Sequence, residues 1–83
     1  MIKELPDKMY QRFILNIKYI REQKGITQIE LANYSNVSRS TIKSIEHRGS
    51  YCSFQTAALI AFSLDHHLGD LLTVQYFPEG FPE

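Results

Sequence analysis

One hexapeptide decides the fold of this 83-residue chain: residues 26–31 read ITQIEL. Thr27 is a favourable helix N-cap, and Glu30 three positions later completes a capping box, in which each side chain accepts a hydrogen bond from the other residue's backbone N–H. Ile26 before the cap and Leu31 at the fourth helical position form the apolar pair that often closes the first turn of such a helix. The hexapeptide therefore predicts a short helix that starts after Thr27.

The same arrangement recurs one short turn later. Asn36, just past the end of this helix, tolerates the left-handed backbone that a sharp turn between helices needs. Ser38 is the next N-cap, with Val37 before it and Ile42 at the fourth helical position, so we expect a helix over residues 38–47. Two short helices joined by a tight turn have the dimensions of a helix-turn-helix.

Three further helices flank this pair. Apolar residues three and four positions apart predict an amphipathic helix over residues 7–24, which Asp7 caps and after which Gly25 provides a left-handed exit. A fourth helix is expected from Ser53 to near Asp65. A short fifth helix follows, and its cap is either Asp65 or His67.

The size and composition indicate one small domain. Hydrophobic residues make up 43% of the chain and charged residues 22%, which is a globular balance. Strand signals are nearly absent, because the one β-leaning stretch, residues 73–77, is followed by prolines. We therefore expect an all-α bundle of five helices over residues 1–72 and an apolar, acidic tail over residues 73–83.

The composition and the motifs of the sequence argue against several classes of protein. Cys52 is the one cysteine, so neither a disulfide framework nor a cysteine zinc site can form within the chain. The sequence has no run of about 20 apolar residues and no signal-peptide pattern, so we expect a cytoplasmic protein that does not enter a membrane. It also has no phosphate-binding glycine loop, paired metal ligands or nucleophile motif. We therefore expect no enzyme, no metal and no cofactor.

The formal net charge of zero hides a gradient along the chain. Residues 1–26 carry a net charge of +3 and residues 27–50 carry +1, whereas residues 51–83 contain no Lys or Arg and carry −4. A chain with this distribution can face a polyanion such as DNA with its first half while its acidic half meets another partner.

The side of the predicted third helix opposite Ile42 and Ile45 is small, polar and basic. It carries Arg39, Ser40, Lys43, Ser44 and His47. Such side chains form hydrogen bonds with base edges and phosphates, and the helix N-terminus adds its own partial positive charge. An ordinary solvent-exposed helix face would look similar. The position of this helix directly after a capped helix and a tight turn favours DNA binding.

Two sequence patterns identify a family resemblance. Residues 21–32 follow the pattern R-E-x-x-G-x-T-Q-x-E-L-A without a mismatch, and residues 37–46 follow V-S-x-x-x-I-x-x-[IWL]-E. With these patterns the chain resembles the phage-repressor-like helix-turn-helix family, the Cro and Xre class of bacterial transcription regulators. The resemblance implies a five-helix bundle whose third helix enters the major groove. Leu59 and Phe62 depart from the family, which commonly has polar residues at these positions.

The resemblance also implies roles for single residues. The base-contacting candidates are Arg39, Ser40, Lys43 and Ser44. Gln28 would contact a phosphate, and Arg21 and Glu46 correspond to a structural salt bridge between the first and third helices. Ser38 at the cap and Arg48 and Tyr51 in the loop after the third helix carry phosphate-bonding groups, so they complete the phosphate-contacting candidates.

The apolar residues near the C-terminal end predict a subunit interface. The candidates are Leu59 and Phe62 on the fourth helix and Tyr76 and Phe77 in the tail. The alternative is a tail that packs against its own domain. A two-fold homodimer would place two recognition helices about 34 Å apart, one turn of DNA, and would favour a palindromic site.

These features predict a sequence-specific DNA-binding transcriptional regulator, a dimeric repressor or autoregulator whose partner is double-stranded DNA. The alternative is a protein-interaction module on the same scaffold, such as an antitoxin or antirepressor. The neutral net charge, the acidic second half and the apolar tail favour that alternative, in which the chain would bind a partner protein.

Overall fold

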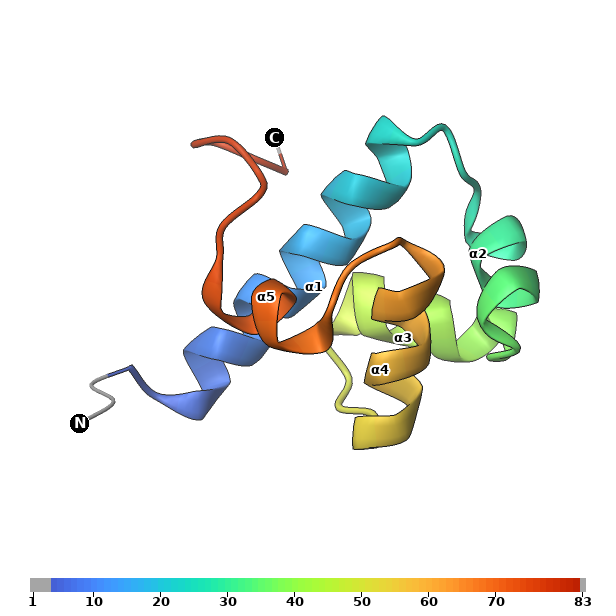
Figure 1. Ribbon diagram of the computed structural model, residues 1–83, viewed down its shortest axis with the longest axis horizontal. Helices are drawn as coiled ribbons and strands as arrows, with labels where there is room; N and C mark the ends of the chain where they lie inside the picture. Colours follow the sequence, from blue (N-terminus) through green and yellow to red (C-terminus); the bar gives the residue numbers. More distant parts are fainter. Residues whose placement is uncertain (1–3, 83) are drawn as a thin grey trace.

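Five helices and no strand make up residues 4–82, the part of the chain that the computed structural model describes (Figure 1). They are α1 (Pro6–Gln23), α2 (Gln28–Ser35), α3 (Arg39–Arg48), α4 (Phe54–Ser63) and α5 (Leu68–Thr73). The prediction of an all-α, five-helix bundle is confirmed. Residues 1–3 and Glu83, the ends of the predicted domain and tail, lie outside the described residues.

Helix α1 begins one residue earlier than its predicted cap. Its N-cap is Leu5, which makes no side-chain cap bond, and Pro6 occupies the first turn. Proline suits this position because its φ is already helical and its missing N–H would have no helical partner there. The prediction that Asp7 caps the helix is therefore wrong. Asp7 lies in the first turn, where a negative charge favours the helix N-terminus.

The caps of α2 and α3 agree with the sequence. Thr27 Oγ1 accepts from the Glu30 N–H at 3.1 Å, and Glu30 Oε1 accepts from the Thr27 N–H at 2.9 Å, so the capping box is confirmed. Asn36 is left-handed, with φ 57°, and turns the chain between the two helices. Ser38 Oγ accepts from the Thr41 N–H at 3.2 Å. Helix α3 then continues to Arg48, one residue further than predicted.

Helices α4 and α5 differ from the prediction at their junction. Ser53 caps α4 as expected, with its Oγ accepting from the Thr56 N–H at 3.1 Å. The helix ends at Ser63, and Asp65 takes a left-handed φ of 64°, which no helix can continue. His67 occupies the N-cap position of α5 without a side-chain cap bond. Of the two cap candidates, the structure thus places His67 at the helix start.

The core lies between α1 and the other four helices. Its fully buried apolar side chains are Phe13, Ile17, Leu31, Ile42, Ile45, Ile60, Leu64 and Leu71. Helix α1 packs against α5 and α3, and α2 packs against α3 and α4. Because α3 turns both its isoleucines into this core, its opposite side must face outward.

The tail folds back onto α1 through a buried asparagine. Asn16 is 0% exposed, and its Nδ2 donates to the carbonyl oxygens of Leu71 at 2.9 Å and Val74 at 2.7 Å. Its Oδ1 accepts from the Tyr76 N–H at 2.8 Å. Every polar atom of this buried amide is thus bonded to backbone of α5 or the tail, which holds the tail in cis.

Aromatic contacts also hold the tail against the rest of the domain. The ring of Tyr76 lies 4.9 Å from that of His66, and the ring of Phe81 lies 5.3 Å from that of Tyr19 on α1. Phe77 is half-buried and contacts Phe81. Tyr76 and Phe77, predicted at a dimer interface, therefore pack within their own chain.

Candidate nucleic-acid interface

The outward side of α3 is open to solvent. Arg39, Ser40 and Lys43 are exposed, whereas Ile42 and Ile45 on the other side of the helix are buried. The tail lies along α1, well away from α3 in the view of Figure 1. The face that the sequence predicts for DNA is therefore not covered by the rest of the described chain.

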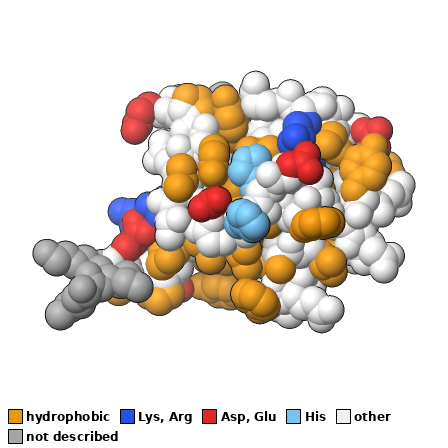
Figure 2. Space-filling view, viewed as in Figure 1, with side chains coloured by type: hydrophobic (Ala, Val, Ile, Leu, Met, Phe, Trp, Pro, Cys, Tyr) orange, Lys and Arg blue, Asp and Glu red, His pale blue; other side chains and the backbone are white. Residues whose placement is uncertain are grey.

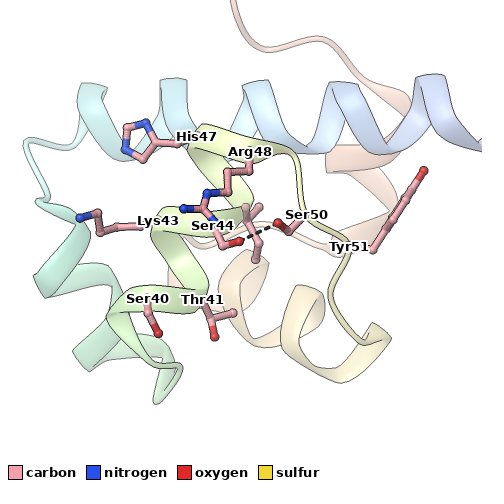
Figure 3. A pocket seen from close by; sticks show the side chains of 9 residues that line it. Ser40, Thr41, Lys43, Ser44, His47, Arg48, Ser50 and Tyr51 are labelled. Atoms are coloured by element: carbon pink, nitrogen blue, oxygen red, sulfur yellow. Dashed lines mark hydrogen bonds between the residues drawn. The ribbon is translucent and has the colours of Figure 1, made fainter.

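A shallow hollow of about 680 Å³ extends from this face to the loop after α3 (Figure 3). We call it the α3 hollow. It is lined by Ser40, Thr41, Lys43, Ser44, Ile45, His47, Arg48, Ser50 and Tyr51. Hydroxyl groups and cationic or titratable nitrogens dominate this lining, and no carboxylate takes part in it. Such a surface suits phosphate oxygens and the acceptor atoms of bases.

The structure separates the predicted base contacts into two groups. Ser40 and Lys43 are exposed at the α3 hollow, and Arg39 is exposed at the start of the helix, outside the lining. Ser44 is half-buried, and its Oγ lies 2.6 Å from the Oγ of Ser50 (Figure 3). The hydroxyl of Ser44 therefore already has a partner in the loop.

Two of the predicted phosphate contacts, Ser38 and Tyr51, also have partners within the chain. Ser38 Oγ accepts from the Thr41 N–H and lies 2.7 Å from Thr41 Oγ1. The hydroxyl of Tyr51 donates to Asp7 Oδ1 at 2.7 Å, and this hydrogen bond raises the pKa of Tyr51. Arg48 lines the α3 hollow and is exposed. Of these three residues, Arg48 is thus the one whose charged group is offered directly to the hollow.

The loop that carries Tyr51 is anchored to α1. The Tyr10 hydroxyl donates to the Ser50 carbonyl oxygen at 2.6 Å and lies 3.6 Å from Cys52 Sγ. Burial, together with the bond to Cys52, raises the pKa of Tyr10 above its ordinary value. The Tyr10 and Tyr51 rings are 4.9 Å apart, so two aromatic residues and two hydrogen bonds hold the loop beside α3.

A buried ion pair ties α3 to α1. Arg21 Nε lies 2.8 Å from Glu46 Oε2, and Arg21 Nη2 lies 2.9 Å from Glu46 Oε1. The side chains are 11% and 0% exposed, and Arg21 Nη1 also donates to the Ile26 carbonyl oxygen at 2.8 Å. This fork-shaped pairing fixes the rotation of α3 about its axis, so the outward side of the helix is held in one orientation.

Gln28 extends this ion pair to the surface. Its Nε2 donates to Glu46 Oε1 at 3.0 Å and lies 3.0 Å from His47 Nε2. Gln28 is half-buried and lies outside the lining of the α3 hollow, but its partner His47 belongs to that lining. The predicted phosphate contact is therefore joined to the hollow through a histidine.

Four residues of the hollow were not among the predicted contacts: Thr41, Ile45, His47 and Ser50. His47 lies one helical turn after Lys43, so helical periodicity alone includes it in the outer face. Ser50 belongs to a loop, and no local pattern predicts that its hydroxyl meets that of Ser44. The position of Ser50 depends on the Tyr10 anchor, which acts over 40 positions of sequence.

A second exposed surface lies on α4 and is apolar. Phe54 and Phe62 are 79% and 80% exposed, and Leu59 is 39% exposed. They surround a shallow depression of about 510 Å³ whose other lining residues are Gln55, Ala58, His66, His67 and Leu68. We call these eight residues the α4 patch. Figure 2 shows hydrophobic side chains gathered over the region of α4.

Within residues 4–82, none of the helices combines the length and the hydrophobicity of a membrane-spanning segment. In the same part of the chain, no three His, Cys, Asp or Glu side chains gather as ligands of one metal ion would.

Comparison with known proteins agrees with this geometry. The sequence pattern of a family described as helix-turn-helix matches residues 17–61, which run from the middle of α1 through α2 and α3 into α4. Neither a curated protein nor a solved structure matches the chain. The matched segment covers more than half of the chain and contains the capped helix pair, the buried ion pair and the open side of α3. The chain belongs to the Cro/Xre-type helix-turn-helix family of DNA-binding proteins.

Proposed function

We propose that this protein is a sequence-specific transcriptional regulator that inserts α3 into the major groove of DNA. The observation that carries the proposal is the open, carboxylate-free side of α3, held in one orientation by the Arg21–Glu46 pair. An α-helix fits the major groove, where side-chain hydrogen bonds distinguish the four base pairs. The gene under control and the sign of the regulation are separate from this property.

The exposed residues of α3 receive distinct roles in this proposal. Arg39, Ser40 and Lys43 contact base edges, because they are exposed and lie on one side of the helix. Ser44 contributes through the hydroxyl pair that it forms with Ser50. Arg48 contacts a backbone phosphate from the end of the helix, and Tyr51 does so by exchanging its bond to Asp7 for one to a phosphate oxygen.

The active form in this proposal is a homodimer that joins two copies of the α4 patch. Phe54, Ala58 and Phe62 follow one another at four-residue intervals, so they form one ridge about 12 Å long, with the small residue at its centre. Two such ridges can cross at Ala58 with a phenylalanine of each copy on either side. None of the eight patch residues is Lys, Arg, Asp or Glu, so the pairing brings no such charges together.

The tail is left out of this interface. Tyr76 and Phe77 pack in cis, and Asn16 bonds the backbone on which they lie. Leu59 and Phe62 are the predicted interface residues that belong to the α4 patch. A two-fold axis through α4 would place two copies of α3 side by side, as two half-sites of a palindrome about 34 Å apart require.

The decisive experiment is the selection of bound sequences from a random pool of double-stranded DNA, combined with the mass of the protein–DNA complex. The proposal expects an enriched palindromic site and two protein chains per site. Its affinity should fall steeply with salt, because phosphate contacts release counterions. A pool without enrichment, bound with the same weak affinity as any DNA, would contradict the sequence-specific function.

The exposed α4 patch also favours the second candidate, a protein-interaction module such as an antitoxin or antirepressor. In that case the protein would co-purify with another protein through the patch, and its binding to DNA would be weak and independent of sequence. The same selection separates the two candidates, because an enriched DNA site is expected for the first alone.

A further inference from the structure

One amide nitrogen links the start of α2 to the last turn of α3. Gln28 Nε2 lies 3.0 Å from Glu46 Oε1 and 3.0 Å from His47 Nε2. A carboxylate accepts hydrogen bonds and donates none, so the amide of Gln28 must turn its nitrogen, and not its oxygen, toward Glu46. The orientation of this amide therefore follows from its buried partner.

That orientation selects the tautomer of a neutral His47. The second N–H of Gln28 needs an acceptor, and the atom facing it, His47 Nε2, accepts if the imidazole is neutral and carries its proton on Nδ1. Both N–H groups of Gln28 are then used inside the protein. The remaining amide oxygen cannot bond a phosphate oxygen, because both atoms are acceptors. Gln28 therefore has no free donor for phosphate while His47 is neutral.

We infer that His47 is a phosphate-binding residue that takes up a proton from solvent when the DNA backbone binds. The protonated ring donates from Nε2 to a phosphate oxygen. Because His47 Nε2 no longer accepts, the Gln28 N–H that faced it is left to donate to the same phosphate, while the other N–H keeps its bond to Glu46. This inference rests on the proposed function, in which α3 faces DNA.

The charged neighbours of His47 on its own helix suit an anion. Lys43, one turn earlier, and Arg48, the next residue, line the α3 hollow together with His47 (Figure 3). A phosphate placed among them supplies the negative charge that stabilises the imidazolium.

The neighbouring helices do not change the charge around His47. Glu46 is paired with Arg21 of α1, so its charge is already neutralised by the buried pair. The contact from α2 is the uncharged Gln28, and Glu30, the acid in the first turn of that helix, bonds the Thr27 N–H. Of the charged groups around His47, the DNA phosphate is thus the one that is present in the bound state and absent from the free state.

The test measures the affinity of the purified protein for a random-sequence duplex of about 30 base pairs, or three turns of DNA. A phosphate contact does not depend on sequence, so no operator is needed. The dissociation constant is measured at one low salt concentration from pH 6 to pH 8. One proton taken up per bound subunit makes the affinity rise up to about tenfold for each pH unit by which the pH falls if one subunit binds, and up to about a hundredfold if both subunits of a dimer bind.

The variants are His47→Gln and, as control, Asp70→Asn. Glutamine at position 47 keeps an acceptor for Gln28 and a donor for phosphate but does not titrate, so we expect its affinity to be independent of pH. Asp70 is exposed on α5, outside the α3 hollow and the α4 patch, and its variant should keep the full pH dependence. A His47→Gln protein with wild-type pH dependence would overturn the inference.

A second measurement follows the wild-type protein directly. The ring resonances of His47 report its pKa by nuclear magnetic resonance, and this pKa should rise when the duplex is added. Binding that depends on salt but not on pH, with an unchanged His47 pKa, contradicts the inference and leaves the proposed function intact. No binding to any duplex at any pH contradicts both.

Discussion

The side-chain oxygen of Asn16 accepts a hydrogen bond from the backbone N–H of Tyr76 at 2.8 Å, across 60 positions of sequence. The same amide donates to Leu71 and Val74, so one polar residue in the apolar face of α1 attaches both α5 and the tail. A buried polar group contributes to stability when all its bonds are made, and it is costly when its partners are left alone.

The change Asn16→Leu is therefore expected to lower the free energy of unfolding by about 3 kcal/mol, because two carbonyl oxygens and one N–H lose their partner. Urea unfolding followed by circular dichroism measures this loss. The variant Gln11→Leu, at an exposed position of the same helix, should change stability by less than about 0.5 kcal/mol. Equal stability of the two variants would show that water replaces the asparagine at no cost.

The Arg21–Glu46 pair should couple strongly in a double-mutant cycle. Removing the carboxylate alone, in Glu46→Leu, leaves a buried guanidinium and is expected to cost about 3–5 kcal/mol. Replacing both residues, in Arg21→Met with Glu46→Leu, should recover a large part of that loss, since no buried charge remains. The measurement is the unfolding free energy of the four proteins. Additive effects of the two single changes would argue against the coupling.

Arg39→Ala should weaken binding to the selected DNA site by roughly 1–3 kcal/mol and relax the base preference at one position. The reason is the loss of hydrogen bonds to a base edge in the major groove. Lys24→Ala is the control, since Lys24 pairs with Asp65 at the junction of α4 and α5. A loss of affinity that is the same for every DNA sequence would assign Arg39 to a phosphate.

Phe62→Lys should convert the proposed dimer to a monomer and reduce affinity for a palindromic site. Phe62 is 80% exposed, so its replacement leaves the fold of one chain intact, but two lysines would meet across the proposed two-fold axis. Tyr34→Lys, at an aromatic residue on α2 that is 61% exposed, is the matched control. Analytical ultracentrifugation gives the mass of each protein. A Phe62→Lys dimer would place the interface elsewhere.

The contact between Glu4 and Arg12 predicts an effect of acid. Arg12 Nη1 donates to Glu4 Oε1 at 2.6 Å, and this hydrogen bond lowers the pKa of Glu4 from its ordinary value of 4.5. A lowered pKa means that the stabilisation is present above pH 4.5 and is lost as the pH falls through the lowered value. The thermal midpoint of Glu4→Gln should thus lie below that of the wild type at pH 7 and approach it in acid. Glu79→Gln, at an exposed tail residue, should show no such pH-dependent difference.

The sequence predicted those features whose causes are local. The caps at Thr27, Ser38 and Ser53 each depend on residues within four positions, and all three are present in the structure. The predicted start of the first helix was wrong, because Pro6 begins this helix without a side-chain cap. Asp7 was predicted as the cap, but no side chain caps this helix. Local chemistry thus predicts the presence of a helix reliably. It predicts the first residue of that helix less reliably.

The features that the sequence did not predict depend on contacts between distant residues. Nothing near Asn16 indicates that its amide will meet backbone groups more than 50 positions away, and nothing near Ser44 indicates the hydroxyl of Ser50. The apolar residues of the tail could pack in cis or between subunits, since hydrophobicity has no direction. The position of the candidate interface followed from periodicity, but which of its hydroxyls are already bonded required the structure.

The attachment of the tail to α1 has a practical consequence for labelling. In Figure 3 the tail runs above α1, whereas α3 lies below it. A fluorophore or a surface linker attached to an exposed residue of the tail, such as Glu79, would leave the molecule from the α1 side. Single-molecule or surface-based assays can therefore be built on the tail with α3 facing away from the label.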